Sequence, residues 1–247
     1  MNRLPPDEWD SLTPPENIFK LNLMSKRTTI LATGEIYHLF NRAVARQPIL
    51  TRTKDLQRFL DIVNFYRFKD PPFRYSHYYR FQPEQKVRIL TTLYKTSVPI
   101  VEIYAFSLMP NHFHFLVKQR VDQGIKLFAS HIQNSFAKYY NTKYKRSGSL
   151  FQEMFKAERI ETDEQFIHVA RYIHINQLTG FIIKEFKELE TYPWTSYPDY
   201  MGKRQLPFLN KELLLGYFPK LQKLREFTLD QVGYQRTLKG IKHLTFD

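Results

Sequence analysis

The chain has 247 residues, 43% of them hydrophobic, which is enough to bury a sizeable core. It contains no cysteine, and this excludes disulfides, cysteine-ligated zinc sites and thiol nucleophiles. Its formal net charge is +13, and 16% of its residues are aromatic. This balance predicts a nucleic-acid partner, because basic side chains bind phosphates and aromatic rings stack on unpaired bases. Ordinary solubility is the alternative explanation of the charge.

No apolar stretch is long enough to cross a bilayer, and the N-terminal residues lack the apolar core of a signal peptide. We therefore expect a cytoplasmic protein with no membrane partner, associated with the nucleoid if it binds DNA. Residues 1–29 hold Pro5, Pro6, Pro14 and Pro15 and show little periodicity. They are predicted to form an extended N-terminal arm.

The first periodic segments follow Gly34. Residues 36–44 are predicted to form a strand, and the apolar spacing over residues 55–66 predicts a helix. Residues 67–83, rich in Pro, Tyr and Arg, are predicted to be an inserted loop outside the core. A second short helix is predicted over residues 84–96.

Two strong strands come next, over residues 98–108 and 112–119. The three residues between them include Pro110, which favours a tight turn, so the two strands should form an antiparallel hairpin. A helix is then predicted from Gly124 to about Asn141, with its apolar residues on one face.

A short strand is predicted over residues 156–160, and Thr162 with Gln165 has the pattern of a capping box at the start of a helix that ends before Gly180. The order of elements is therefore βαββαβ plus one helix. This order is typical of a ferredoxin-like α+β fold with an antiparallel sheet. We expect this domain over residues 30–183, with an insertion around residues 67–96. A C-terminal helical extension should follow over residues 184–247, mostly helical between residues 206 and 224.

The centre of the chain is the pair His112 and His114. Side chains two residues apart on a strand point to the same side, so both imidazoles should converge while Phe113 and Phe115 enter a core. Two converging imidazoles can form half of a metal site. A buried, hydrogen-bonded histidine pair is the structural alternative.

The helix after Thr162 carries Tyr172 and Asn176, which lie four residues apart and so share one face. If this helix packs beside the hairpin, the Asn176 amide oxygen can join His112 and His114 as a third ligand, with Tyr172 next to the cation. A tyrosine beside a metal ion can attack a phosphodiester, forming a 5′-phosphotyrosine link and a free 3′-hydroxyl. Two nitrogen ligands and one oxygen ligand suit Mg²⁺ or Mn²⁺.

The segment from Met109 to His114 resembles the HUH motif (His, hydrophobic residue, His) of the IS200/IS605-type Y1 transposases. Other segments are similar to the REP-associated tyrosine transposases within that family: Tyr37-His38, Gly148-Ser149-Leu150-Phe151-Gln152, Tyr172-Ile173-His174-Ile175-Asn176 and Tyr192-Pro193-Trp194-Thr195-Ser196-Tyr197. The resemblance covers roughly residues 30–200.

This resemblance implies a ferredoxin-like HUH endonuclease that nicks and rejoins single-stranded DNA near hairpin or palindromic elements. It implies that His112, His114 and Asn176 hold the metal and that Tyr172 is the nucleophile. The insertion-sequence transposases have a glutamine four residues after the tyrosine, whereas Gln177 here is five residues after it. Gln177 is displaced by about 100° around the helix and is the less favoured ligand. REP-associated relatives imply a monomer that acts in cis, with a homodimer that acts in trans left open.

Further residues are expected to bind nucleic acid. They lie on the polar face of the helix that begins at Gly124 and in the basic loop after it: Gln133, Asn134, Lys143, Lys145 and Arg146. Side chains of this kind contact phosphates and position the nucleic acid without specifying its sequence. A solvated basic loop is an equally good explanation of the three cations.

Two other functions compete with strand transfer. A domesticated, non-transposing protein could bind repeats and regulate or process them, and the loss of a catalytic residue would indicate it; His112, His114, Tyr172 and Asn176 are all present. A histidine-ligated metal hydrolase would need a carboxylate base next to the histidines. None lies beside them in the sequence.

Overall fold

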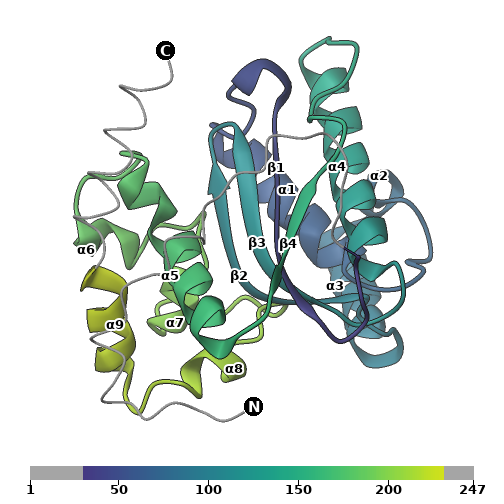
Figure 1. The fold of residues 1–247 in the computed structure, drawn as a ribbon. Coiled ribbons are helices and arrows are strands. Elements are labelled where there is room, and N and C mark those ends of the chain that lie inside the picture. The colour runs from purple at the N-terminus through teal and green to yellow at the C-terminus, as the bar shows by residue number, and fades with distance from the viewer. Residues whose placement is uncertain (1–29, 231–247) are drawn as a thin grey trace.

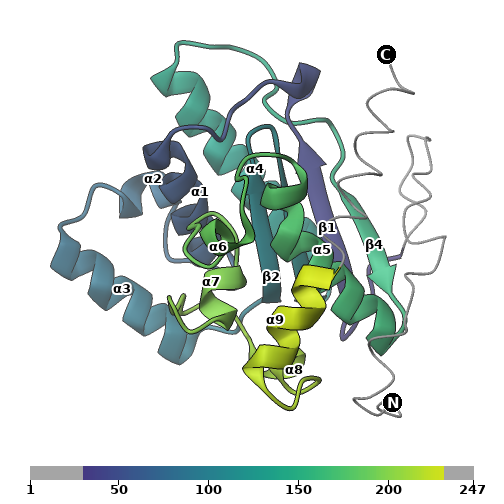
Figure 2. The same cartoon turned by 90° about the vertical axis from the view of Figure 1, so that its left-hand side faces the viewer.

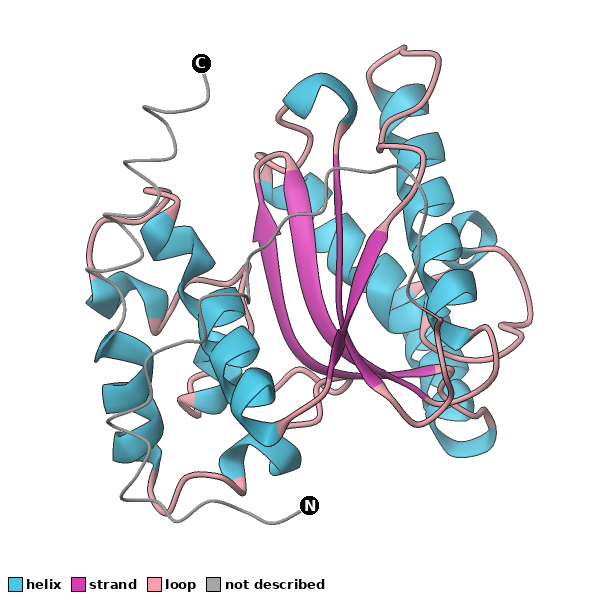
Figure 3. Ribbon diagram, in the orientation of Figure 1, coloured by secondary structure: helices cyan, strands magenta, loops and turns pink. Residues whose placement is uncertain are grey.

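The computed structural model describes residues 30–230, which are organised around a four-stranded antiparallel sheet (Figure 1). The strands are β1 (Ile36–Arg42), β2 (Val101–Met109), β3 (His112–Gln119) and β4 (Lys156–Ile160), in the spatial order β2-β3-β1-β4. Helices follow β1 and β3 along the chain, so the connectivity is βαββαβ. Figure 3 distinguishes the strands of the sheet from the helices around it. The predicted α+β, ferredoxin-like class is confirmed.

Helices cover the two faces of the sheet differently. Helices α1 (Thr53–Tyr66) and α4 (Gly124–Lys143) cover one face, where Phe59 and Phe136 pack with Phe113 and Phe115 of β3. Helix α5 (Asp163–Thr179) lies on the opposite face, over β2 and β3. The alternation of apolar residues along β3 therefore separates the large core from the face that carries the two histidines.

The strand register decides which side chains share that second face. Phe40 lies opposite His114, and Arg42 lies opposite His112. Directly opposed residues of an antiparallel pair point to the same side of the sheet. His38, Phe40 and Arg42 of β1 therefore project toward the α5 side, beside the two histidines.

Helix α5 is held at its start by Thr162, as predicted. The Gln165 amide donates to the Thr162 hydroxyl over 3.1 Å, and the Gln165 side chain accepts from the amide of Glu161 over 2.8 Å. In a regular capping box the Gln165 side chain would accept from the backbone amide of Thr162. Here it accepts from the residue before, so the cap differs from the predicted pattern by one residue. The N-cap still satisfies donors that have no partner inside the helix.

The prediction of a loop outside the core over residues 67–83 is wrong. This segment contains helix α2 (Tyr75–Tyr78), and the rings of Tyr75 and Tyr78 are buried against Phe65. The Arg58 guanidinium lies 3.8 Å from the ring centroid of Tyr79. Burial of these large rings and their cation–π contacts favours an ordered structure despite the prolines.

The predicted short helix over residues 84–96 is present as α3 (Pro83–Thr96). A 3-10 helix, η2 (Val44–Arg46), follows β1. Toward the C-terminal end of residues 30–230, four short helices gather around α5: α6 (Phe186–Leu189), α7 (Tyr197–Tyr200), α8 (Glu212–Leu215) and α9 (Leu221–Asp230). They lie on the side away from α1 and α4 in Figure 1 and face the viewer in Figure 2. The expectation of a mostly helical stretch over residues 206–224 is only partly right. Asn210 is not helical, and its backbone amide donates to the Ile103 carbonyl of β2.

The predicted N-terminal arm over residues 1–29 lies outside the described residues, as do residues 231–247. The boundaries at residues 30, 183 and 184 stay predictions. No helix within residues 30–230 combines the length and apolar character needed to span a bilayer.

Candidate active site

His112, the half-buried first residue of β3, has a defined hydrogen-bond partner. The Asn111 amide nitrogen donates to the Arg46 carbonyl over 3.2 Å, so the Asn111 amide oxygen faces His112 Nδ1, 2.6 Å away. Because an amide oxygen can only accept, the proton lies on His112 Nδ1. Nε2 of the neutral ring then keeps the lone pair that a metal ligand needs.

His114 is buried and lies against His38 of β1. Its Nδ1 is 2.9 Å from His38 Nε2, and the two rings are nearly parallel with centroids 5.1 Å apart. Burial lowers the pKa of His38 to about 3, so this ring is neutral at physiological pH. The Nδ1 atom on the far side of His38 lies 3.9 Å from the Glu158 carboxylate of β4.

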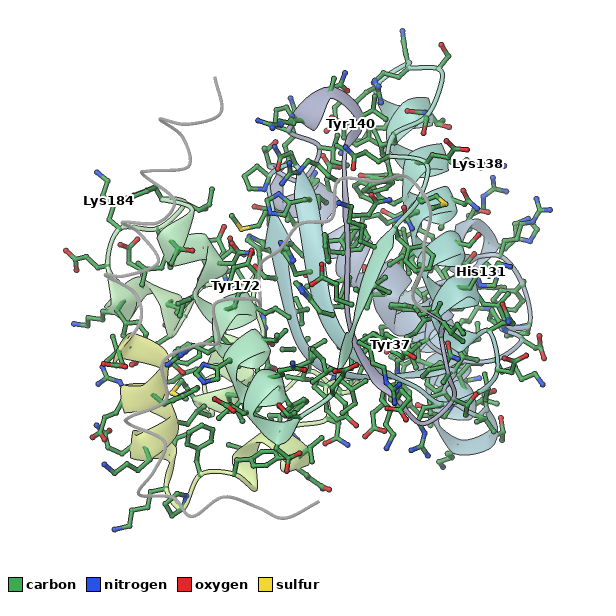
Figure 4. All side chains as sticks on the ribbon, viewed as in Figure 1. Tyr37, His131, Lys138, Tyr140, Tyr172 and Lys184 are labelled. Carbon is green, nitrogen blue, oxygen red and sulfur yellow. The ribbon has the colours of Figure 1, made fainter. Side chains whose placement is uncertain are left out.

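Tyr172 of α5 faces this histidine pair. Its ring stands perpendicular to that of His114 with the centroids 5.6 Å apart, and its centroid lies 6.0 Å from that of His38. Figure 4 shows Tyr172 on the part of α5 next to the sheet. Burial raises the pKa of Tyr172 to about 12, against the opposing effect of the Arg42 charge and of a hydrogen bond with Asn176. The phenol is therefore protonated at neutral pH.

Asn176 is buried one helical turn after Tyr172, and their side chains are hydrogen-bonded. The alternative ligand, Gln177, lies on another side of α5. Its amide nitrogen is 3.0 Å from the Ser107 hydroxyl and 2.9 Å from the Leu108 carbonyl. This residue is thus held against β2, while Asn176 shares the surroundings of Tyr172.

The donor set at this site fits a divalent cation. Within residues 30–230, no group of three or more His, Cys, Asp or Glu side chains could hold a metal ion. The Asn176 amide oxygen is a donor of another type, and it lies beside Tyr172, whose ring faces His114. His112 keeps Nε2 as a lone-pair donor, and two imidazoles with one amide oxygen leave coordination positions for substrate.

The residues predicted to bind nucleic acid lie on the α4 side of the sheet. Gln133 accepts from the Asn41 amide over 2.5 Å, and both Gln133 and Asn134 line a cavity of about 500 Å³ between α4 and residues 153–155. Figure 4 shows Lys138 and Tyr140 of the same helix across the sheet from Tyr172. The structure therefore does not bring Gln133 and Asn134 to the histidine pair.

The basic loop after α4 lies at the same end of the sheet as the β2–β3 turn and η2 (Figure 1). The two lysines of this region differ in their ionic partners. Lys143, the last residue of α4, has its Nζ 2.5 Å from the buried Asp55 carboxylate, whereas Lys145 lies in the exposed loop itself. The Arg146 guanidinium donates to the Asn141 side chain over 3.1 Å. The charge of Lys143 is thus already balanced inside the protein.

Three residues that the sequence did not assign to the site lie next to it: Arg42 opposite His112, His38 beside His114, and Glu158 beside His38. The alternation His38, Phe40, Arg42 along β1 was a usable signal, because it places all three on one face. The pairing of β1 with β3 was needed to bring that face to the histidines.

Part of the chain matches a known protein family. The family described as "Transposase IS200 like" matches residues 83–176, a segment that includes His112, His114, Tyr172 and Asn176. No curated protein matches the chain significantly.

The solved structures that are similar to this chain include two transposases. One is a REP-associated tyrosine transposase bound to a REP hairpin, with 16% identity, a TM-score of 0.49, and coverage of 75% of this chain and 90% of that chain. The other is a candidate transposase from Deinococcus radiodurans R1, with 14% identity, a TM-score of 0.34, and coverage of 63% of this chain and 98% of that chain. The segment over residues 83–176, with the motifs inside it, is thus similar in sequence to the IS200-like transposases of the Y1 type.

Proposed function

We propose that this protein is a metal-dependent single-stranded DNA endonuclease and strand transferase, with Tyr172 as its nucleophile. The observation that carries the proposal is that α5 and β3 bring their candidate residues together. Tyr172 of α5 stands against His114 of β3 and is hydrogen-bonded to Asn176, so the nucleophile and the candidate ligands share one site. The match of this segment to the IS200-like transposases supports the same function.

The proposed ligands are His112, His114 and Asn176, which hold Mg²⁺ or Mn²⁺. When bound, the cation supplies Lewis-acid polarisation of the scissile phosphate. The Tyr172 oxygen forms a bond to phosphorus, and the bond from phosphorus to the 3′-oxygen breaks. The phenol proton is transferred, in the net reaction, to the departing oxygen, which becomes a 3′-hydroxyl. The 5′-phosphotyrosine link conserves the bond energy, so a 3′-hydroxyl can attack it and rejoin a strand.

Arg42 is proposed to orient the scissile phosphate. Its position opposite His112 puts a permanent cation on the face that carries the histidines, next to Tyr172. A guanidinium can hold two phosphate oxygens at once through its planar fork of donors. This contact would help to hold the phosphorus in line with the attacking oxygen.

The proposed substrate is single-stranded DNA near a hairpin, as in the REP-associated relatives. The REP-associated transposase with a similar fold is bound to a REP hairpin, and the net charge of +13 suits a polyanion. Lys145 and Arg146 are proposed phosphate contacts, together with Gln133 and Asn134 on α4; Lys143 would join them only by leaving Asp55. Such an enzyme would work in the cytoplasm on nucleoid DNA.

We further propose that Tyr172 acts in cis. The ring of Tyr172 contacts His114 of the same chain, so a monomer contains the complete set of candidate residues. This arrangement requires no partner subunit to complete the site.

The test is adduct formation on a labelled hairpin oligonucleotide with a single-stranded flank, incubated with Mn²⁺ or Mg²⁺. A covalent adduct should survive a denaturing gel with the wild-type protein and be absent with Tyr172→Phe. Tyr140→Phe on α4 is the matched control and should form the adduct normally. An unchanged adduct with Tyr172→Phe would refute the nucleophile assignment.

The metal site is tested separately. Replacement of both His112 and His114 by alanine should abolish cleavage in the presence of Mn²⁺, and EDTA should do the same for the wild type. Binding of the hairpin without cleavage by the wild type, at any concentration of either metal, would instead support the domesticated, non-transposing alternative.

A further inference from the structure

His38 is a buried histidine for which the proposed chemistry has no direct use. It lies on β1, between His114 on one side and Glu158 on the other. Its Nε2 is 2.9 Å from His114 Nδ1, and its Nδ1 is 3.9 Å from the Glu158 carboxylate. Its side chain is only 9% exposed. A buried imidazole between a metal-ligand candidate and a carboxylate can control where a proton lies.

The contact between the two imidazoles allows two proton arrangements when both rings are neutral. If His114 Nδ1 carries the hydrogen, it donates to His38 Nε2, and His114 Nε2 keeps its lone pair. If His38 Nε2 carries the hydrogen instead, it donates to His114 Nδ1, and the single ring hydrogen of the neutral His114 must then be on Nε2. That nitrogen could not then bind a cation. The two arrangements differ only in tautomer and have opposite consequences for metal binding.

Glu158 favours the first arrangement. A carboxylate facing His38 Nδ1 stabilises a proton on that atom. The 3.9 Å separation is too long for a direct hydrogen bond, so the influence is electrostatic. A neutral His38 with its proton on Nδ1 presents a bare Nε2 to His114. Asn111 does the equivalent for His112, whose Nδ1 it binds over 2.6 Å.

We propose that His38, biased by Glu158, is a positioning residue that keeps His114 in the tautomer whose Nε2 can bind the cation. This inference rests on the proposed function, since it assigns His114 as a ligand. In this arrangement each HUH histidine has an acceptor on its Nδ1 side, supplied by Asn111 for one and by His38 for the other. The acceptor also fixes the orientation of the ring.

The test compares two substitutions at residue 38 in the full-length protein. His38→Leu removes the acceptor and keeps most of the volume, whereas His38→Gln restores an acceptor oxygen on a flexible side chain. Mn²⁺ affinity, measured by calorimetry without DNA, should fall about tenfold or more in His38→Leu, as is usual for loss of such an outer partner. It should fall by less than about threefold in His38→Gln. His131→Leu on α4, across the sheet, is the control and should bind Mn²⁺ normally.

A second readout reports the tautomer without metal. In ¹⁵N-labelled protein, long-range proton–nitrogen spectra should show the His114 proton on Nδ1 in the wild type. The Nε2-protonated form should grow in His38→Leu and, to a smaller extent, in Glu158→Gln. Glu158 is half-exposed, so Glu158→Gln should fold even if the residue 38 variants do not.

The outcomes separate the two proposals. Absence of Mn²⁺ binding by the wild type would reject the metal site, and with it the proposed function. Wild-type Mn²⁺ binding that is unchanged in His38→Leu, or a His114 proton found on Nε2 in the metal-free wild type, would overturn the role of His38 and leave the metal site standing.

Discussion

Helix α5, which carries the proposed nucleophile, is held against its neighbours in part by one buried polar side chain, Gln177. Its amide nitrogen lies within hydrogen-bond distance of the Ser107 hydroxyl, the Leu108 carbonyl and the Trp194 carbonyl, at 3.0, 2.9 and 3.2 Å. These groups belong to β2 and to the segment after α6, so Gln177 joins α5 to both. Gln177→Met keeps the length and flexibility of the side chain and removes its donors.

The cost of this substitution can be worked out from the contacts. The amide nitrogen has two hydrogens, so it forms two hydrogen bonds at a time, each with a net contribution of about 1 kcal/mol. Ser107 is fully buried, and leaving its hydroxyl without this partner adds about 1 kcal/mol. The Gln177 amide oxygen has no hydrogen-bond partner within residues 30–230, so its removal returns about 1 kcal/mol. We expect a net loss of about 2 kcal/mol.

Urea unfolding followed by circular dichroism measures this loss, with Gln222→Met on α9 as a comparison that removes only an exposed hydrogen bond. Adduct formation with the hairpin oligonucleotide should also slow in Gln177→Met, because α5 carries Tyr172 and Asn176. If the free energy of unfolding and the adduct rate both stay within error of the wild type, Gln177 does not fix the helix and the reasoning is wrong.

Three further predictions follow from other contacts. Burial acts to raise the pKa of Asp55, but hydrogen bonds from Lys143 and two tyrosines outweigh it and lower the pKa. Asp55→Asn should therefore lower the free energy of unfolding by about 2–3 kcal/mol at pH 7, a value reduced because Lys143 is partly exposed. The gap in unfolding free energy between variant and wild type should shrink as the pH falls below about 4, because the wild-type carboxylate then becomes protonated. An equal gap at pH 3 and pH 7 in urea titrations would contradict this. Arg42→Ala should slow adduct formation at least tenfold, and Arg42→Lys should slow it less. On an oligonucleotide whose scissile phosphate is replaced by a neutral methylphosphonate, both variants should bind with the same affinity as the wild type. Gly124→Ala should lower the melting temperature measurably, because the added carbon would overlap the Ile100 carbonyl oxygen.

The sequence alone was sufficient for the βαββαβ order of the strands and their main helices, and for the face of β3 on which the two histidines lie. Apolar periodicity predicted β3 and its alternation of His112 and His114 with Phe113 and Phe115, and the structure has the same arrangement. The four-residue spacing of Tyr172 and Asn176 likewise predicted their shared position on α5. These features are local, because they depend only on the repeat of a strand or a helix.

Local patterns failed where burial depended on distant partners. Tyr75 and Tyr78 stand in a Pro- and Arg-rich segment with no clear period, yet they are buried because Phe65 and Arg58 of α1 offer them a surface. The helix predicted around Asn210 is likewise absent. The Asn210 backbone amide donates to β2, a strand more than 100 residues earlier in the chain.

The tertiary structure alone decided the surroundings of the histidine pair. The HUH motif and the helix with Tyr172 could be recognised along the chain, but Arg42, His38 and Glu158 reach the site only through the pairing of β1 with β3 and β4. Strand register is set by packing across the whole sheet, and a shift of one residue would turn all three side chains to the opposite face. The proposed reacting groups are thus specified by local sequence patterns, while the residues proposed to orient them are brought together by long-range strand pairing.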